Sequence, residues 1–363
     1  MTHRGMKYGI FLAPFHRVGE NPTLAIDRDM ELIEWLDYLG YDEVWIGEHH
    51  SAGWELIASP EIMIAAAAQR TKHIMLGSGV TSLPYHHPFL VAQRFVQLDH
   101  MTRGRAMLGC GPGALVSDAY MLGIEASTQR ERMDEALDAI MALLRCEEPV
   151  TMKTDWFELR DARLHLAPYT DPCFPISVAS VMTPAGMISA GKHGLVVVGH
   201  VAVDDDELAL RQIHAGERHE TVTYFEETLG RPPGRSDDPI RDGVKAGTTL
   251  VGTPDTVIKG IERLIDFSKG GFGGVLFRAN EWANREDTLK SYELFARYVM
   301  PRFQGSLDTV MGSNLWCRSK RKTIFGPNVA AIRKAFTDAG KPVPKDFTAR
   351  TPGAADVGAG DSD

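Results

Sequence analysis

The chain has 363 residues, 44% of them hydrophobic, so it can bury a large core without disulfides or repeats. Its formal net charge of -9 argues against a general nucleic-acid binder, and no window approaches the ~20 uninterrupted apolar residues of a membrane span. The four cysteines form no CxxC pair, which favours a reducing, cytoplasmic location, and a small molecule is the expected partner.

Short apolar runs alternate with segments of helical periodicity, the pattern of βα units around a parallel sheet. We predict strands at 7–13, 43–47, 74–79, 105–110, 176–179, 195–199 and 274–278. Helices are predicted at 23–39, 60–71, 88–101, 129–144, 184–193 and 285–302, with a hairpin-like insertion within about 147–174.

Unit after unit in this order predicts a TIM-type (β/α)8 barrel, although only seven strands are found. Between 200 and 252 the sequence is helical and then becomes a polar linker, RPPGRSDDPIRDG, with 247–251 as the only extended run. Either that run replaces a barrel strand or the barrel has a gap. We expect a barrel domain at 1–305 and an extension at 306–363 with one helix at 328–339 and a disordered end.

Two histidine pairs follow predicted strands, where catalytic side chains of α/β barrels gather. Glu48, His49 and His50 close the second strand; since strand side chains alternate, we expect only one of these histidines to enter the barrel mouth. It is either a hydrogen-bond donor to a ligand or a support for a loop. His86 and His87, held between two prolines, are either a cavity wall or ordinary loop residues. The spacings do not favour a metal site.

The run GCGPGA at 109–114 follows a strand but lacks the spacing of a dinucleotide fingerprint. We interpret it, like 78–81, as backbone that comes close to a flat ligand. Arg130 and the SVMTP segment at 180–184 precede or open helices and are candidate phosphate ligands. The alternatives are a surface ion pair for Arg130 and a helix cap for Thr183.

Seven segments together resemble the bacterial luciferase-like flavin monooxygenases. They are MKYGIFLAPF, DEVWIGEHH, GSGVTSLPYHHP, LDHMTRGRAMLGCGPGA, GTPDTV, GGFGGVLFRANEW and SYELFARYVMPRF. Within that family the chain looks closest to the limonene 1,2-monooxygenase type.

The resemblance implies a barrel that binds reduced FMN, supplied by a separate flavin reductase. It also implies reaction with O2 through a C4a-(hydro)peroxyflavin, and insertion of one oxygen atom into a small apolar, terpene-like substrate such as limonene. Carried over by position, His49 and Glu48 are catalytic, with His49 a donor to the peroxide. Gly79 and Val80 match the site of a non-prolyl cis peptide, and a homodimer is expected. The cofactor candidates are Gly79, Val80, Gly111, Arg130, Ser180, Val181 and Thr183, and the cavity candidates are His50, Trp54, His86 and His87.

The resemblance breaks at about 201–247, where relatives carry a sixth helix and the seventh strand. We therefore expect a barrel that lacks one βα unit, in the region of the seventh strand. Two alternative functions stay open: a non-catalytic flavin-binding paralogue or partner subunit, which the short segment favours, and an oxidoreductase of the same fold that uses the deazaflavin coenzyme F420.

Overall fold

The computed structural model describes residues 5–13, 15–179, 195–202, 205–234, 236–268, 272–280 and 282–347. Contacts divide the chain into two units, Met1–Gln304 and Gly305–Asp363, and each is described by itself. The predicted helix at 184–193 lies outside the described residues.

The first part of the larger unit alternates strand and helix as predicted. Each of its first three long helices begins with a proline, which has no N–H to leave unpaired at that position. The first ends at Gly40, whose φ of 82° is left-handed. The elements are β1 (Lys7–Leu12), α1 (Pro22–Leu39), β2 (Glu43–Ile46), α2 (Pro60–Arg70), β3 (Met75–Ser78), β4 (Thr81–Ser82), η1 (Leu83–Tyr85), α3 (Pro88–Thr102) and β5 (Ala106–Gly111).

A short helix that the sequence analysis missed follows β5. This helix, α4, exposes most of its apolar side chains and buries only Asp118 and Ala119, so it carries no apolar stripe for a periodicity search to find. The predicted insertion is a two-stranded antiparallel hairpin of β6 and β7. These elements are α4 (Val116–Met121), η2 (Ala126–Thr128), α5 (Gln129–Arg145), β6 (Val150–Lys153), β7 (Glu158–Ala162), β8 (Ile176–Val178) and β9 (Leu195–Val201).

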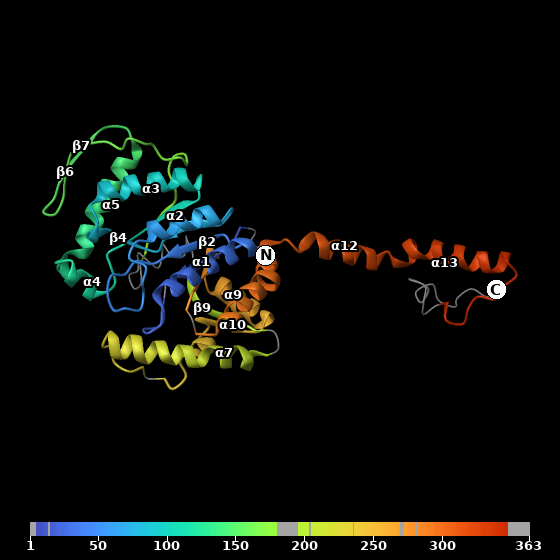
Figure 1. Cartoon of the computed structure of the whole chain (residues 1–363). Helices are drawn as coiled ribbons and strands as arrows, with labels where there is room; N and C mark the ends of the chain where they lie inside the picture. The colour runs from blue at the N-terminus through green and yellow to red at the C-terminus, as the bar shows by residue number, and fades with distance from the viewer. Residues whose placement is uncertain are drawn as a thin grey trace. The chain divides into compact units, whose positions relative to one another are not determined.

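The prediction of a polar linker at RPPGRSDDPIRDG is wrong for the second half of that run. There the chain forms α8, which Asp238 caps by accepting from the Arg241 N–H at 3.0 Å. Before it, α7 continues into a π-helical segment, η3, as one long helix (Figure 1). The remaining elements are α7 (Asp206–His219), η3 (Glu220–Thr228), α8 (Pro239–Ala246), β10 (Thr249–Gly252), α9 (Pro254–Phe267), β11 (Gly274–Arg278), α10 (Arg285–Leu294), η4 (Phe295–Val299) and α11 (Met300–Gln304).

The main sheet is parallel and runs in the order β10, β9, β11, β1, β2, β3, β5, with β4 and β8 also paired to β5. The last strand in the chain, β11, pairs with the first, from Lys7↔Gly274 to Phe11↔Arg278. That pairing is typical of a barrel rather than of an open doubly wound sheet. The strands therefore present their carboxyl ends at one rim.

The barrel has its irregular side where the sequence resemblance breaks. β9 pairs directly with β11, so no strand lies between them, and β10 pairs with the carboxyl half of β9. Among the described residues no ladder joins β8 to β9 or β10. β9 and β11 therefore have no unpaired edge toward each other. The open edges of the sheet are those of β8 and β10.

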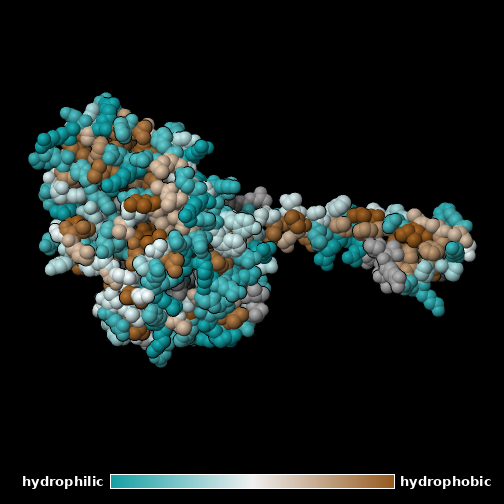
Figure 2. Space-filling view, viewed as in Figure 1, coloured by the Kyte–Doolittle hydropathy of each residue, from teal (hydrophilic) through white to brown (hydrophobic). Residues whose placement is uncertain are grey.

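The core lies between the strands and the surrounding helices. On the face shown in Figure 2, apolar residues of the larger unit lie in small groups among hydrophilic ones. Among the described residues, no helix is both long and apolar enough to cross a membrane. Fully buried core side chains include Tyr8, Ile10, Ile33, Leu36, Val44, Ile46, Leu76, Phe95, Leu108, Ile140 and Phe295.

In the second unit, the described residues up to 347 form the helices α12 (Asp308–Ser319) and α13 (Arg321–Asp338). The sequence predicted only the later part of α13 and missed α12. No residue of α12 is buried, so its sequence gives no clear apolar face. In α13, Val329 is buried with Phe347 in a small apolar cluster.

Candidate active site

Glu48 is the centre of a buried cluster at the carboxyl ends of β2, β3 and β5. Its Oε1 lies 3.1 Å from His50 Nε2 and 2.5 Å from His86 Nε2, and its Oε2 accepts from the Ser82 N–H at 2.5 Å. Glu48 is only 4% exposed. Burial alone would raise its pKa, but the hydrogen bonds from His50, His86 and Ser82 lower it to about 2. Glu48 is therefore ionised, and both histidines donate to it.

His49 is held between two other carboxylates. Its Nε2 lies 2.9 Å from Glu55 Oε2 and its Nδ1 lies 3.1 Å from Asp118 Oδ2. Burial alone would lower the pKa of His49, but the hydrogen bonds and charges of Glu55 and Asp118 raise it to about 9. His49 is thus an imidazolium at neutral pH. Because both N–H groups are used, donation to a bound ligand requires one carboxylate to release its hydrogen bond.

His49 and His50 join one network, which corrects the expectation that only one of them enters the site. Strand alternation does not apply because β2 ends at Ile46, two residues before Glu48. Asp118 of α4 connects the two histidines: it binds the His49 ring and also accepts from the His50 N–H at 3.2 Å. The hydrogen bond to Glu48 raises the pKa of His50.

The other predicted cavity residues divide into two groups. His86 joins His50 on Glu48, as described above. Trp54 is buried against the ring of Tyr224, with centroids 5.3 Å apart. His87 is exposed and packs against Phe157 near the hairpin, with centroids 5.9 Å apart. The structure therefore brings together two of these four residues.

The glycines predicted to lie near a flat ligand are explained by packing within the protein. The Gly79–Val80 peptide is cis, as the resemblance implies. A Cβ at Gly79 would lie 2.7 Å from Trp45 Cβ, and one at Gly111 would lie 2.5 Å from Val80 Cγ2. Because Cβ contacts shorter than 3.0 Å essentially never occur, protein atoms alone require glycine at both positions.

Gly113, in the same loop, gives a prediction. Its φ is +90°, and an added Cβ would lie 2.2 Å from the Tyr85 hydroxyl. Gly123 also has a positive φ, +70°, but an added Cβ there would meet nothing within 4 Å. We expect Gly123→Ala to cost about 1 kcal/mol of unfolding free energy and Gly113→Ala about 3 kcal/mol. Urea unfolding measures both; equal losses would contradict the crowding at Tyr85.

Of the candidate phosphate ligands, only Arg130 is among the residues that the structure describes. Arg130 is exposed in the first turn of α5, and no ion pair or hydrogen bond of its side chain is found among the described residues. Ser180, Val181 and Thr183 lie outside the described residues. Next to Arg130, Gln129 is engaged, since it donates to Tyr85 Oη and to the Pro112 carbonyl oxygen.

Sequence reasoning missed four residues around His49. Glu55 and Asp118 hold its ring, Tyr224 of η3 donates to Glu55 Oε1 at 3.0 Å, and Ser51 donates to Asp118. Glu55 and Asp118 could be suspected only as acidic residues that follow strands in the sequence. No sequence signal leads to Tyr224, which lies 169 positions from Glu55.

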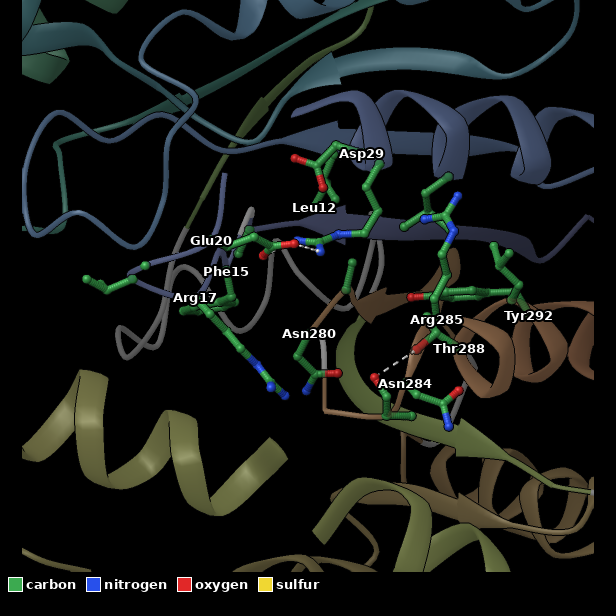
Figure 3. Close-up of a pocket in the computed structure, with 18 residues that line it drawn as sticks. Leu12, Phe15, Arg17, Glu20, Asp29, Asn280, Asn284, Arg285, Thr288 and Tyr292 are labelled. Carbon is green, nitrogen blue, oxygen red and sulfur yellow. Dashed lines mark hydrogen bonds and ion pairs between the residues drawn. The ribbon is translucent and has the colours of Figure 1, made fainter. Parts of the chain in front are cut away.

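A cavity of about 500 Å³ lies at the carboxyl ends of β1 and β11 (Figure 3). It is bounded by the middle of α1 and the first two turns of α10, and neither the Glu48 cluster nor any predicted site residue lines it. Four of its charged residues are paired: Arg28 with Glu20, Asp29 with the buried His16 at 3.0 Å, and Arg285 with Glu31. Phe15 separates this cavity from Tyr224, because it lines the cavity and its ring packs on that tyrosine at 5.4 Å.

Residues 6–216 match the family model described as luciferase-like monooxygenase. The chain is 42% identical over 356 aligned positions to 4-hydroxyprotoasukamycin monooxygenase of Streptomyces nodosus subsp. asukaensis, covering 86% of this chain and 96% of the relative. It is 41% identical over 341 positions to limonene 1,2-monooxygenase of Rhodococcus erythropolis, covering 83% and 87%. In both alignments the number of aligned positions is larger than the number of residues of this chain that take part. Both relatives therefore carry residues within the match that this chain lacks.

Solved structures give the same fold. The monooxygenase RslO1 of Streptomyces bottropensis superposes with a TM-score of 0.71 at 22% identity, covering 82% of this chain and all of that one. The FMN-bound oxygenating constituent of 3,6-diketocamphane monooxygenase of Pseudomonas putida gives 0.68 at 23% identity, with coverages of 82% and 98%. An F420-dependent secondary alcohol dehydrogenase gives 0.58 at 19% identity, with coverages of 82% and 99%.

Proposed function

Because the chain belongs to the luciferase-like monooxygenase family, we propose that it is an FMN-dependent two-component monooxygenase that inserts one oxygen atom from O2 into a small apolar, terpene-like substrate. The observation that carries the proposal is the position of His49, held between the buried carboxylates of Glu55 and Asp118 at the carboxyl ends of the barrel strands. Two relatives with more than 40% identity over most of the chain are named monooxygenases, which supports the reaction class.

The residues at the barrel rim fit a flavin mononucleotide. The Thr81 hydroxyl, beside the Gly79–Val80 peptide, is buried and has no hydrogen-bond partner among the described residues. Arg130 offers an exposed guanidinium at the start of a helix, where the backbone dipole also favours an anion. We propose that Gly79, Val80, Thr81 and Gly111 lie beside the flavin ring, and that Arg130, with Ser180, Val181 and Thr183, holds the phosphate.

Bound reduced FMN would supply the reaction with O2. The chain's own residues hold protons and exclude water. His49 carries a proton on each ring nitrogen at neutral pH, and Glu48 fixes His50 and His86 beside it. The carboxylates of Glu48, Glu55 and Asp118 are buried, so their hydrogen bonds to the histidines are stronger than they would be in water. These bonds hold the imidazole rings in fixed positions.

Two other functions each have one observation in their favour. The fold likeness to an F420-dependent dehydrogenase supports a deazaflavin oxidoreductase, which would not consume O2. The direct pairing of β9 with β11, and the extra residues of both relatives, support a flavin-binding paralogue or partner subunit without turnover. Binding of reduced FMN without substrate oxygenation would favour the second.

Arg130 gives a binding test of the proposed cofactor. We expect Arg130→Ala to weaken reduced FMN binding about 10- to 100-fold, the loss of one charge-assisted hydrogen bond, and to leave riboflavin binding unchanged. Anaerobic fluorescence titration measures both. Arg132→Ala, on the same helix but paired with Asp155 at 3.5 Å, is the matched control and should behave as wild type. Equal weakening of FMN and riboflavin in Arg130→Ala would remove Arg130 from the phosphate site.

A further inference from the structure

Tyr224 connects the helix that follows β9 to the buried histidine. The Tyr224 hydroxyl donates to Glu55 Oε1 at 3.0 Å, and the other oxygen of the same carboxylate lies 2.9 Å from His49 Nε2. Tyr224 is 2% exposed and Glu55 7%. Burial, with the nearby Glu55 charge, raises the pKa of Tyr224, so its hydroxyl keeps the proton that it donates. Tyr224, Glu55 and His49 therefore form one buried chain of hydrogen bonds.

The position of the Tyr224 hydroxyl is fixed by its surroundings. Its ring packs against Phe15 and Trp54, with centroids 5.4 and 5.3 Å apart. The Glu55 backbone is fixed as well, because Glu55 forms an antiparallel bridge with Phe15. With both ends held, the tyrosine hydroxyl determines how the Glu55 carboxylate is rotated and which of its oxygens faces His49.

A second buried contact anchors the same helical segment. Glu220, four residues before Tyr224 and therefore near the same helix face, accepts from Arg278 at the end of β11 and from Trp282 Nε1, the latter at 2.6 Å. Just before it, Gly216 lies against the Trp282 backbone, where a Cβ would meet Trp282 Cα at 2.2 Å. η3 is thus held against the loop after β2 by Tyr224 and against the end of β11 by Glu220.

We infer that Tyr224 and Glu55 are a positioning pair that sets the orientation of the His49 ring, so that η3, a segment far along the chain, helps to assemble this acid. The inference deepens the proposed function and rests on it for the role of His49 as an acid. Neither residue is catalytic itself, since both act through His49. The titratable groups that surround the ring are Glu55, Asp118, Glu48, His50 and Tyr224.

The arrangement predicts separate effects for the two members of the pair. Glu55→Gln keeps the shape but removes a charge 2.9 Å from His49, so the His49 pKa should fall by about 1 to 2 units from about 9. Tyr224→Phe keeps the ring packing and that charge, but frees the carboxylate to rotate. In this variant we expect the His49 N–H to exchange with water about tenfold faster than in the wild type. The fraction of consumed O2 that is released as hydrogen peroxide should rise several-fold.

Two measurements on the full-length chain test the inference. Nitrogen NMR of labelled histidine follows the His49 titration and exchange, with the signal assigned from His49→Gln. Oxygen consumption and peroxide release with reduced FMN and limonene give the uncoupled fraction. Thr221→Val is the matched control: it removes a hydroxyl of η3 that donates to Glu217 at 2.7 Å rather than to Glu55, and it should match wild type in both measurements.

The two measurements separate failure of the inference from failure of the proposed function. A His49 midpoint in Glu55→Gln equal to that of wild type, or a Tyr224→Phe variant whose exchange matches Thr221→Val, overturns the positioning pair. A wild-type chain that binds no reduced flavin overturns the proposed function, and the NMR titration and exchange still decide the pair. Shifted titration, faster exchange and higher peroxide release, with FMN affinity unchanged, is the result that the inference expects.

Discussion

Replacing Glu48 by glutamine is expected to lower the free energy of unfolding by about 3 kcal/mol at pH 7, because it removes the charge that two histidines and one amide surround. His50, His86 and the Ser82 N–H all donate to this side chain, which is fully buried. An amide of the same size can accept from them, but it carries no charge, and its NH2 group faces donors. Urea unfolding followed by circular dichroism measures the loss.

The pH dependence identifies the charge as the cause. The pKa of Glu48 is lowered in the folded chain to about 2, from an ordinary value of 4.5, so its contribution is present above pH 4.5 and is lost as the pH falls through about 2. The difference between variant and wild type should therefore shrink in that window. Glu34→Gln, which removes an exposed partner of Arg70, is the control and should cost less than about 1 kcal/mol. A loss at Glu48 no larger than at Glu34 would refute the buried cluster.

Replacing His49 by glutamine is expected to reduce coupled oxygen insertion at least 100-fold while changing reduced FMN affinity less than about threefold. Glutamine fits between Glu55 and Asp118 but carries no transferable proton at neutral pH. Oxygen should then leave as hydrogen peroxide rather than enter the substrate. Product formation and peroxide release, measured with limonene and an excess of reduced FMN, give both quantities.

If the proton of His49 is used, coupled turnover of the wild-type enzyme should depend on pH. The pKa of His49 is raised from 6.5 to about 9, so the imidazolium and its contribution to stability are fully present below pH 6.5 and are lost as the pH rises through about 9. Coupled turnover should fall over that upper range. His73→Gln, which changes an exposed histidine before β3, should leave rate and profile unchanged. Coupled turnover of His49→Gln within threefold of wild type would show that this proton is not used.

Sequence periodicity predicted most of the fold because the barrel strands are buried on both faces and their helices are amphipathic. The β11 strand at Gly274–Arg278 has the predicted limits. The missed helices lack a long buried apolar face: α4 and α8 are only 6 and 8 residues long, too short to establish a helical period, and α12 buries no residue. The direct pairing of β9 with β11, beside the segment where the resemblance breaks, is seen only in the structure.

The candidate site was predictable only where it lies beside a strand end. Glu48, His49, His50 and His86 follow strands, and their residue types suggest proton chemistry. Their partners come from distant helical segments: Asp118 of α4 is 69 positions from His49, and Tyr224 of η3 is 169 from Glu55. Side-chain orientation after a strand ends is set by these contacts, which a single sequence does not encode in any local pattern.

The proposed oxygen insertion is tested most directly by isotope transfer. The full-length chain is mixed anaerobically with reduced FMN and limonene, then with O2 enriched in oxygen-18, and the products are analysed by mass spectrometry. The account predicts a product that carries one labelled oxygen atom, with labelled hydrogen peroxide as a minor product. Binding of reduced FMN with all of the label in hydrogen peroxide and none in an organic product, across limonene and related cyclic terpenes and ketones, would contradict it.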